Sequence, residues 1–334
     1  MNNRVIGLIM TLTIAWGLGG AMSARGDNDP DLRFAVTDGV VNTVLSDGVN
    51  IFLGGNFSEA GPNTGHGAEL NVANGARDTN GPLITGPAGS AVYAVVHDGD
   101  KGWFIGGDFA LVREDPRGEI ASRSSAAKKF SRAHLAHIKN DKTVSRLLDA
   151  VPNGPVRALV YAATARRLYV GGAFTDIDGE SHLRIAAIDT TTGAPITAWS
   201  PAVADGVVRA LALSNDGATL FMGGNFTTVN GVAGIRGIAA IDTASGNLIG
   251  AWGAGAASVG TGEQINAIEV VDTKLYVAGN FSTVGGKARS NIAALSVTDG
   301  VADDTWNPGA DGIVQALSVG NLGTFIYAGG AFST

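Results

Sequence analysis

The chain contains no cysteine among its 334 residues. Without thiols it has no disulfide framework, no lipid-modified cysteine and no thiolate metal site. Charged residues make up only 16% of the sequence, form no long block of one sign, and leave a net charge of −7. This balance argues against a nucleic-acid surface, which depends on clustered Lys and Arg. The 45% hydrophobic content is ample for a large buried core.

Glycine is abundant, with 49 residues. Some of these glycines belong to a Gly-Gly-x-Phe motif that recurs six times, once as Ala-Gly-Asn-Phe. Successive motif phenylalanines are 52, 65, 52, 55 and 51 residues apart. A fixed period of this size is typical of a repeat architecture. The motif phenylalanines are Phe57, Phe109, Phe174, Phe226, Phe281 and Phe332.

Each repeat holds four short apolar segments bounded by Gly, Asp, Asn and Pro. In the fourth repeat these are Val208–Leu211, Leu220–Met222, Ile238–Asp242 and a last segment closed by Trp252. Such runs predict strands, and helical spacing is absent from the repeats. Four strands in a unit of this length predict a β-propeller blade. We expect an all-β propeller of four-stranded antiparallel blades, with Ala and Gly columns between blades and Phe and Trp filling the outer gaps.

Residues 1–24 have the order of features of a secretory signal peptide: Arg4, an apolar stretch over residues 5–18, and the small residues Ala21 and Ala24. We expect cleavage, export to the cell envelope or medium, and no membrane span afterwards. An uncleaved anchor helix is the alternative. Residues 25–33 are then a short leader, and residues 34–334 are the repeat domain.

The repeat domain begins at the end of a unit, because Phe34–Val41 resembles Pro201–Val208. Five units are complete, and the sixth stops at Thr334 just after its motif. A propeller that does not close leaves sheet edges exposed. We therefore expect five complete blades and a partial sixth in a fragment of a longer ring, and greater stability in a chain extended to close it.

The repeat between Phe109 and Phe174 carries a polar insertion between Val112 and Arg132. We interpret it as a loop between the second and third strands. It is either a tolerated surface insertion or a flap over one face.

The sixth repeat reads DTWNPGADGIVQAL over Asp304–Leu317, followed by Gly-Gly-Ala-Phe. It resembles the delta-60-type repeats of bacterial β-propellers, and Val208–Trp252 matches as well. The resemblance covers about residues 34–334 and is weaker in the first two units, where Trp is replaced. It implies an exported, modular bacterial protein with a WD-like strand order, the Val-x-Ala-Leu segment being innermost. It supplies no general catalytic motif.

Two patterns resemble metal sites, and the repeat alignment and strand geometry argue against both. Asp176–Glu180 resembles the start of a calcium loop, but its Asp178-Gly179 takes the slot of Asn230-Gly231, a pair suited to a tight hairpin turn. His134 and His137 lie three apart near a predicted strand, where such side chains point to opposite faces. We predict no metal and no cofactor.

Other motifs follow from the repeat itself. The sequons at Asn56, Asn225 and Asn280 fall inside the recurring motif, so we do not expect glycosylation. Asp residues such as Asp205 and Asp311 fill repeated turn slots, which indicates scaffold rather than paired catalytic carboxylates. No Gly-x-Ser-x-Gly nucleophile elbow occurs.

One column carries the candidate site, the second position of each predicted innermost strand. Its neighbours along the strand are mostly apolar, so these side chains either hydrogen-bond between blades or form a polar ring that binds a small polar or anionic ligand. Within such a ring, arginine suits carboxylates and sulfates, amides suit sugar hydroxyls, and tyrosine stacks on a ring. The column consists of Asn42, Tyr93, Arg157, Arg209, Asn266 and Gln315.

We therefore predict a secreted, non-catalytic binding or cell-envelope module, with a polar or anionic glycan or a cell-surface protein as partner. The alternative is a secreted propeller enzyme, a polysaccharide lyase or hydrolase. That alternative needs non-repeated His, Tyr, Arg or carboxylate residues converging at one face, and such residues are few.

Overall fold

The computed structural model describes residues 37–46, 50–58, 66–71, 81–114, 128–253, 257–320 and 324–334. The predicted signal peptide (1–24), the leader (25–33) and residues 115–127 of the insertion lie outside the described residues. The chain divides into two compact units. We call the described residues up to Arg146 the N-terminal unit and those from Leu147 to Thr334 the C-terminal unit.

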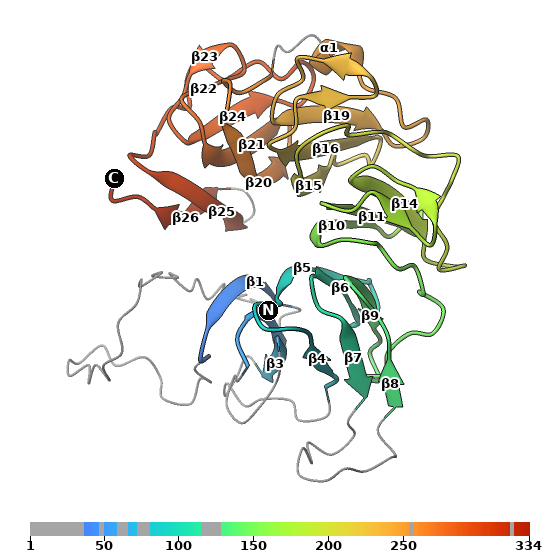
Figure 1. Ribbon diagram of the computed structural model, residues 1–334. Coiled ribbons are helices and arrows are strands. Elements are labelled where there is room, and N and C mark those ends of the chain that lie inside the picture. Colours follow the sequence, from blue (N-terminus) through green and yellow to red (C-terminus); the bar gives the residue numbers. More distant parts are fainter. Residues whose placement is uncertain are drawn as a thin grey trace, which may run out of the picture. The chain divides into compact units, whose positions relative to one another are not determined.

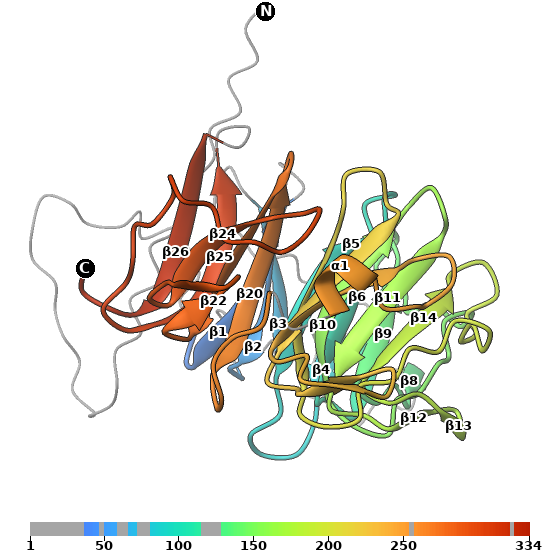
Figure 2. The same cartoon turned by 90° about the horizontal axis from the view of Figure 1, so that it is seen from above.

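The C-terminal unit consists of repeats three to six, each folded as an antiparallel sheet. The inner strands of successive sheets lie side by side, as the green-to-red order of β10, β15, β20 and β25 shows in Figure 1. Figure 2 shows β10, β20 and β25 from above. The inner strands are β10 (Val156–Ala162), β15 (Val208–Leu213), β20 (Gln264–Val271) and β25 (Ile313–Gly320). The second strands are β11 (Arg167–Gly172), β16 (Thr219–Gly224), β21 (Lys274–Asn280) and β26 (Phe325–Ala331). The third strands are β14 (Ile185–Asp189), β19 (Ile238–Asp242) and β24 (Ile292–Ser296).

The N-terminal unit repeats this plan in its two blades. The first blade has β1 (Val40–Ser46), β2 (Asn50–Asn56) and β3 (Gly67–Asn71), and the second has β5 (Val92–His97), β6 (Trp103–Gly107) and β9 (Leu135–Ile138). The inner strands β1 and β5 lie side by side. A further sheet joins β4 (Leu83–Thr85), β7 (Leu111–Glu114) and β8 (Lys128–Phe130), so the insertion extends a β-hairpin between the second and third strands.

The fourth segment of each complete described blade pairs with the third strand through one isolated bridge instead of a full ladder. The bridges are Ile138↔Val144, Ile188↔Pro195, Ile241↔Leu248 and Leu295↔Ala302. In repeats three to five a glycine in the left-handed region makes the preceding turn, for example Gly193 at φ 78°. The described fold is thus an all-β propeller-type array, as predicted, with fourth strands much shorter than the other three. The one described helix is α1 (Gly250–Gly253), which has four residues.

The core lies between neighbouring sheets, and tryptophan fills its outer part as predicted. Trp199 and Trp252 are each 1% exposed. Trp199 packs edge-on against Tyr169 of its own repeat, with ring centroids 5.1 Å apart, and its Nε1 donates to Asp242 O of the next repeat at 3.3 Å. Trp252 packs against Phe221 with tilted rings, centroids 5.2 Å apart, and its Nε1 donates to Val297 O of the next repeat at 3.2 Å. Each tryptophan therefore joins one blade to the next.

The two motif glycines have different steric roles. A methyl group on the first glycine would meet the next blade, at 2.6 Å from Val208 Cγ1 for Gly171 and 2.6 Å from Ile265 Cγ2 for Gly223. A methyl group on the second glycine would meet the inner strand of the same blade, at 2.0 Å from a backbone carbonyl oxygen for Gly224 and for Gly279. The first position sets the spacing between blades, and the second lets the inner strand approach.

The Asp178-Gly179 hairpin is a tight turn, as its alignment predicted. Asp178 and Gly179 have φ angles of 55° and 85°, and Asn230 and Gly231 have 50° and 78°. Two successive positive φ values define a type I′ hairpin turn. The turn connects β12 (Asp176–Ile177) to β13 (Glu180–Ser181). Its counterparts are β17 (Thr228–Val229) with β18 (Val232–Ala233), and β22 (Thr283–Val284) with β23 (Lys287–Ala288).

Candidate functional site

All six residues of the predicted polar column lie at a β-bulge. In every inner strand the register with the second strand shifts across this position, for example between Val156 and Ala158 and between Val208 and Ala210. The bulge lies beside the second motif glycine, whose missing side chain makes room for it. A bulge leaves one residue out of the ladder and redirects its side chain. The column is therefore polar because these side chains leave the apolar packing between sheets.

The asparagines of the column connect blades. Asn42 donates from Nδ2 to Val92 O at 3.2 Å, and Asn266 donates from Nδ2 to Val314 O at 3.0 Å. Each acceptor is the residue just before the bulge in the next inner strand. Tyr93 donates to the Asp108 carboxylate at 3.0 Å. These three side chains make structural hydrogen bonds, and the two asparagines make them between blades, as the first of the two alternatives held.

The arginines form the distinctive part of the column. Arg157 on β10 and Arg209 on β15 occupy equivalent bulges of neighbouring blades, and both are half-buried. Burial and the positive charge of Arg157 hold the pKa of the Arg209 guanidinium below its usual value. The Nε of Arg209 is buried and has no hydrogen-bond partner in the described chain. Two like charges thus lie close together, and one retains an unused buried donor.

The rest of the column is divided between the two units. Asn266 and Gln315 follow on β20 and β25 of the C-terminal unit, and Gln315 is exposed. Asn42 and Tyr93 lie on the adjacent inner strands of the N-terminal unit. The described geometry therefore gathers four of the six residues on consecutive strands.

The repeated aspartates accept hydrogen bonds that tie two loops of one blade together, as the scaffold interpretation held, and we call this arrangement the aspartate clasp. Asp205 accepts from the backbone N–H of Thr227 at 2.9 Å and of Thr228 at 3.1 Å, and from the Thr227 hydroxyl at 2.5 Å. Burial opposes ionisation of Asp205, but these hydrogen bonds outweigh it and lower its pKa. Asp311 makes the equivalent bonds to Ser333. The clasp ties the start of the inner strand to the residues after the motif phenylalanine.

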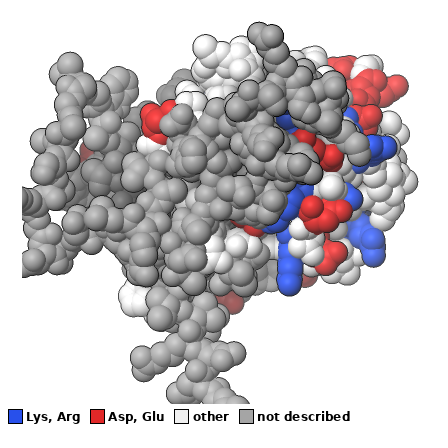
Figure 3. Space-filling view, turned by 90° about the horizontal axis from the view of Figure 1, so that it is seen from below, with Lys and Arg blue, Asp and Glu red and all other residues white. Residues whose placement is uncertain are grey.

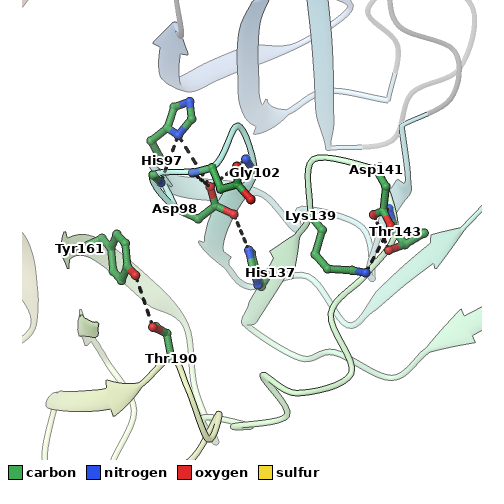
Figure 4. A network of polar contacts seen from close by, with 11 residues as sticks. His97, Asp98, Gly102, His137, Lys139, Asp141, Thr143, Tyr161 and Thr190 are labelled. Atoms are coloured by element: carbon green, nitrogen blue, oxygen red, sulfur yellow. Dashed lines mark hydrogen bonds and ion pairs between the residues drawn. The ribbon is translucent and has the colours of Figure 1, made fainter. Parts of the chain in front are cut away.

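One cluster of non-repeated polar residues was not predicted from the sequence. Asp98 lies between two imidazoles, with Oδ2 2.8 Å from His137 Nε2 and Oδ1 3.8 Å from His97 Nδ1 (Figure 4). Burial raises the pKa of Asp98, but the His137 hydrogen bond and the amides of Asp100 and Gly102 bring it below its usual value. The signal was present in the sequence, because His137 stands where repeats three to five have alanine.

Packing accounts for this cluster. The His137 ring stacks on Phe104, with centroids 4.4 Å apart. In repeats three to five the second-strand aromatic instead packs against the closing tryptophan. The second repeat has the smaller Leu148 in the tryptophan position. His137 therefore supplies the ring that the repeat lacks, and Asp98 satisfies its polar nitrogen.

His134 has a separate role from His137. It adopts a left-handed conformation with φ 68°, and its Nδ1 lies 3.2 Å from Gly107 O. Burial lowers its pKa, partly offset by the Gly107 carbonyl and by Asp108. The two histidines thus contact different groups, and within the described residues no cluster of three His, Asp or Glu has a metal-binding arrangement.

The described surface offers no single-sign stripe on the face seen in Figure 3, where Lys and Arg alternate with Asp and Glu. Within the described ranges, no helix is long and apolar enough to cross a bilayer.

Comparison with known proteins gives no match to a family model and no match among curated proteins. Among solved structures, a chain of the mitotic checkpoint complex has 13% sequence identity and a TM-score of 0.48, covering 95% of each chain. The WD40 domain of Neurospora crassa Pan2 has 12% identity and a TM-score of 0.47, covering 91% of this chain and 88% of that one.

Proposed function

We propose that this protein is an exported, non-catalytic binding module that holds an anionic glycan at Arg157 and Arg209. The observation that carries the proposal is the placement of these two guanidinium groups on adjacent inner strands, close enough for one to lower the pKa of the other. Bringing like charges together costs free energy, and a carboxylate or sulfate between them offsets that cost. Guanidinium groups also present a planar fork of donors that fits both anions.

Of the other column residues in the C-terminal unit, Asn266 supports the site and Gln315 adds to it. Asn266 keeps its Oδ1 towards the Gln264 amide and its Nδ2 on Val314 O, so it acts as scaffold. Gln315 is exposed and offers an amide for hydroxyl groups. The site then takes an acidic or sulfated saccharide through the arginines, with hydroxyl contacts from Gln315 on β25. Export follows from the signal-like residues 1–24, and kinship with delta-60-type propellers from the repeat consensus.

The test is direct binding of dextran sulfate and polygalacturonate, with unmodified dextran as the neutral comparison. Charged hydrogen bonds contribute about 1.5–3 kcal/mol, so the double variant Arg157→Gln/Arg209→Gln should weaken binding of the anionic polymers at least about tenfold. The control is Arg166→Gln/Arg236→Gln, which removes the same charge from two exposed arginines. Equal weakening in both variants, a collapse of the melting temperature in the first, or no binding by the native protein would overturn the proposal.

A polysaccharide lyase or hydrolase remains the second candidate because the Asp98 carboxylate orients His137. The same polymers decide it. Incubation should release no reducing ends and no unsaturated product if the module only binds, whereas product that disappears in His137→Gln would establish the enzyme.

A further inference from the structure

His182 occupies a corner between the hairpin β12–β13 and the third strand β14. Its backbone N–H donates to Thr175 O at 3.0 Å, as Arg289 does to Ser282 O in the fifth repeat. Two residues later the chain passes through a left-handed residue, Arg184 with φ 66°. Arg132 precedes the left-handed His134 by the same two residues. Arg132, His182 and Arg289 therefore share one slot, and all three are at least nine-tenths buried.

In the second and fifth repeats the arginine of this slot binds the fourth segment, whereas the fourth repeat has Ile235 two residues before its left-handed Gly237. Arg132 donates from Nη2 to Ser145 O at 3.2 Å, and Arg289 donates from Nη2 to Asp303 O at 2.6 Å. In the third repeat the equivalent acceptor is Ile196 O, which takes the backbone N–H of Trp199 at 3.0 Å instead. His182 therefore does not make the hydrogen bond to the fourth segment that Arg132 and Arg289 make.

The imidazole of His182 is nevertheless 1% exposed, and neither ring nitrogen has a hydrogen-bond partner in the described chain. Burying a polar ring without partners costs free energy for neutral imidazole and far more for imidazolium. Burial accordingly lowers the pKa of His182, and the carboxylates of Asp176 and Glu180 partly oppose this. These two carboxylates, on β12 and β13, are the charges that act on the ring within the described residues. The nearby Arg184 is held by the carbonyls of Gly206 and Val203.

The same corner joins the third and fourth repeats. Leu183, directly after His182, accepts the backbone N–H of Val203 at 3.2 Å, and Arg184 donates from Nε to Gly206 O at 2.6 Å. A charged His182 would have to leave the interior towards Asp176 and Glu180. Movement of this residue strains the adjacent inter-repeat bonds.

We propose that His182 is a pH-sensitive latch at the junction of the third and fourth repeats, closed while its imidazole is neutral and opened by protonation. The latch is independent of the glycan proposal. The junction is also the one that Arg157 and Arg209 straddle, so acidification should weaken any ligand held there, an expectation that does rest on the proposed function.

Hydrogen exchange tests the latch without a ligand. After correction for chemical exchange, the amides of His182, Arg184 and Val203 should exchange at least about tenfold faster at pH 5 than at pH 7.5 in the native protein. In His182→Gln, which does not titrate, the two rates should agree. His182→Arg, which copies the residue of the fifth repeat, should also remain closed at both pH values. The control His97→Gln removes a more exposed imidazole and should behave as the native protein.

Three results would overturn the latch. The first is unchanged exchange of these amides in the native protein across this pH range. The second is the same acceleration in His182→Gln and His182→Arg. The third is an acceleration spread evenly over all repeats, which would indicate global acid unfolding. If the latch opens but dextran sulfate never binds, the latch stands and the glycan proposal fails.

Discussion

Glu269 on β20 should make this protein less stable as the pH rises through 6. The inner strand is apolar at this position in the other repeats except for Ser318 in the sixth, and Ala212 takes it in the fourth. Burial without a described counter-charge raises the pKa of Glu269 to about 6, from an ordinary value of 4.5. This difference corresponds to about 2 kcal/mol between the two protonation states. The folded state thus binds the proton more tightly than the unfolded chain does.

The sign of the effect follows from this linkage. The contribution of protonated Glu269 is fully present below about pH 4.5 and is lost as the pH rises through the folded pKa of about 6. Urea unfolding of native protein and Glu269→Gln, compared at pH 4.5 and pH 8, should show the variant gaining up to about 2 kcal/mol relative to the native protein at the higher pH.

The native protein and Glu269→Gln share all other titrating groups, including His182. The difference between their free energies of unfolding therefore isolates the titration of Glu269. Asp272→Asn, at an exposed position in the turn after β20, is the matched control and should follow the native pH profile. If Glu269→Gln and the native protein keep a constant stability difference from pH 4.5 to pH 8, the carboxyl is solvated and the reasoning from burial is refuted.

Three further outcomes are expected. Gly224→Ala should lower the free energy of unfolding in urea by about 1–3 kcal/mol, because its methyl group would lie 2.0 Å from a backbone carbonyl oxygen. Gly329→Ala, with open space around it, should be neutral. Equal losses would contradict the steric role of the motif. Lys142→Met should lower stability, by up to about 3–5 kcal/mol, because it removes one ion-pair partner of the buried Glu69 carboxylate, and restoration by Glu69→Gln in the same background is the check. Asp205→Ala should lower the melting temperature at neutral pH and much less below pH 3, since hydrogen bonds lower the pKa of the Asp205 carboxyl and its stabilisation disappears as that group protonates; a deficit independent of pH would exclude the charged clasp.

The blade plan was predictable because it depends on local sequence. The position of Gly-Gly-x-Phe at the end of each second strand, the type I′ pair Asp178-Gly179 and the Ile-Ala-Ala-Ile third strands all follow from turn chemistry and strand propensity. The fourth strand was overestimated for the same reason. Its apolar residues predict a strand, but in repeats two to five the segment follows a left-handed turn residue and forms one isolated bridge only.

The sequence identified the column of polar residues but not the role of each side chain in it. A polar residue between apolar neighbours in every inner strand was visible, but the bulge that explains it is a property of strand pairing. Asn266 and Arg209 occupy the same slot, yet one bonds to the next blade and the other retains a buried donor. The difference depends on side-chain length and on which carbonyl lies opposite.

The sequence by itself determined the repeat, the all-β class, the turn types and the tryptophan and glycine columns, because each depends on residues close together in the chain. Tertiary structure alone decided which unrepeated residues matter. Glu269, His182 and the Asp98 pair acquire their properties from burial between segments far apart in the sequence. Desolvation and partner geometry act at distances of a few ångströms in space, and sequence separation carries no information about either.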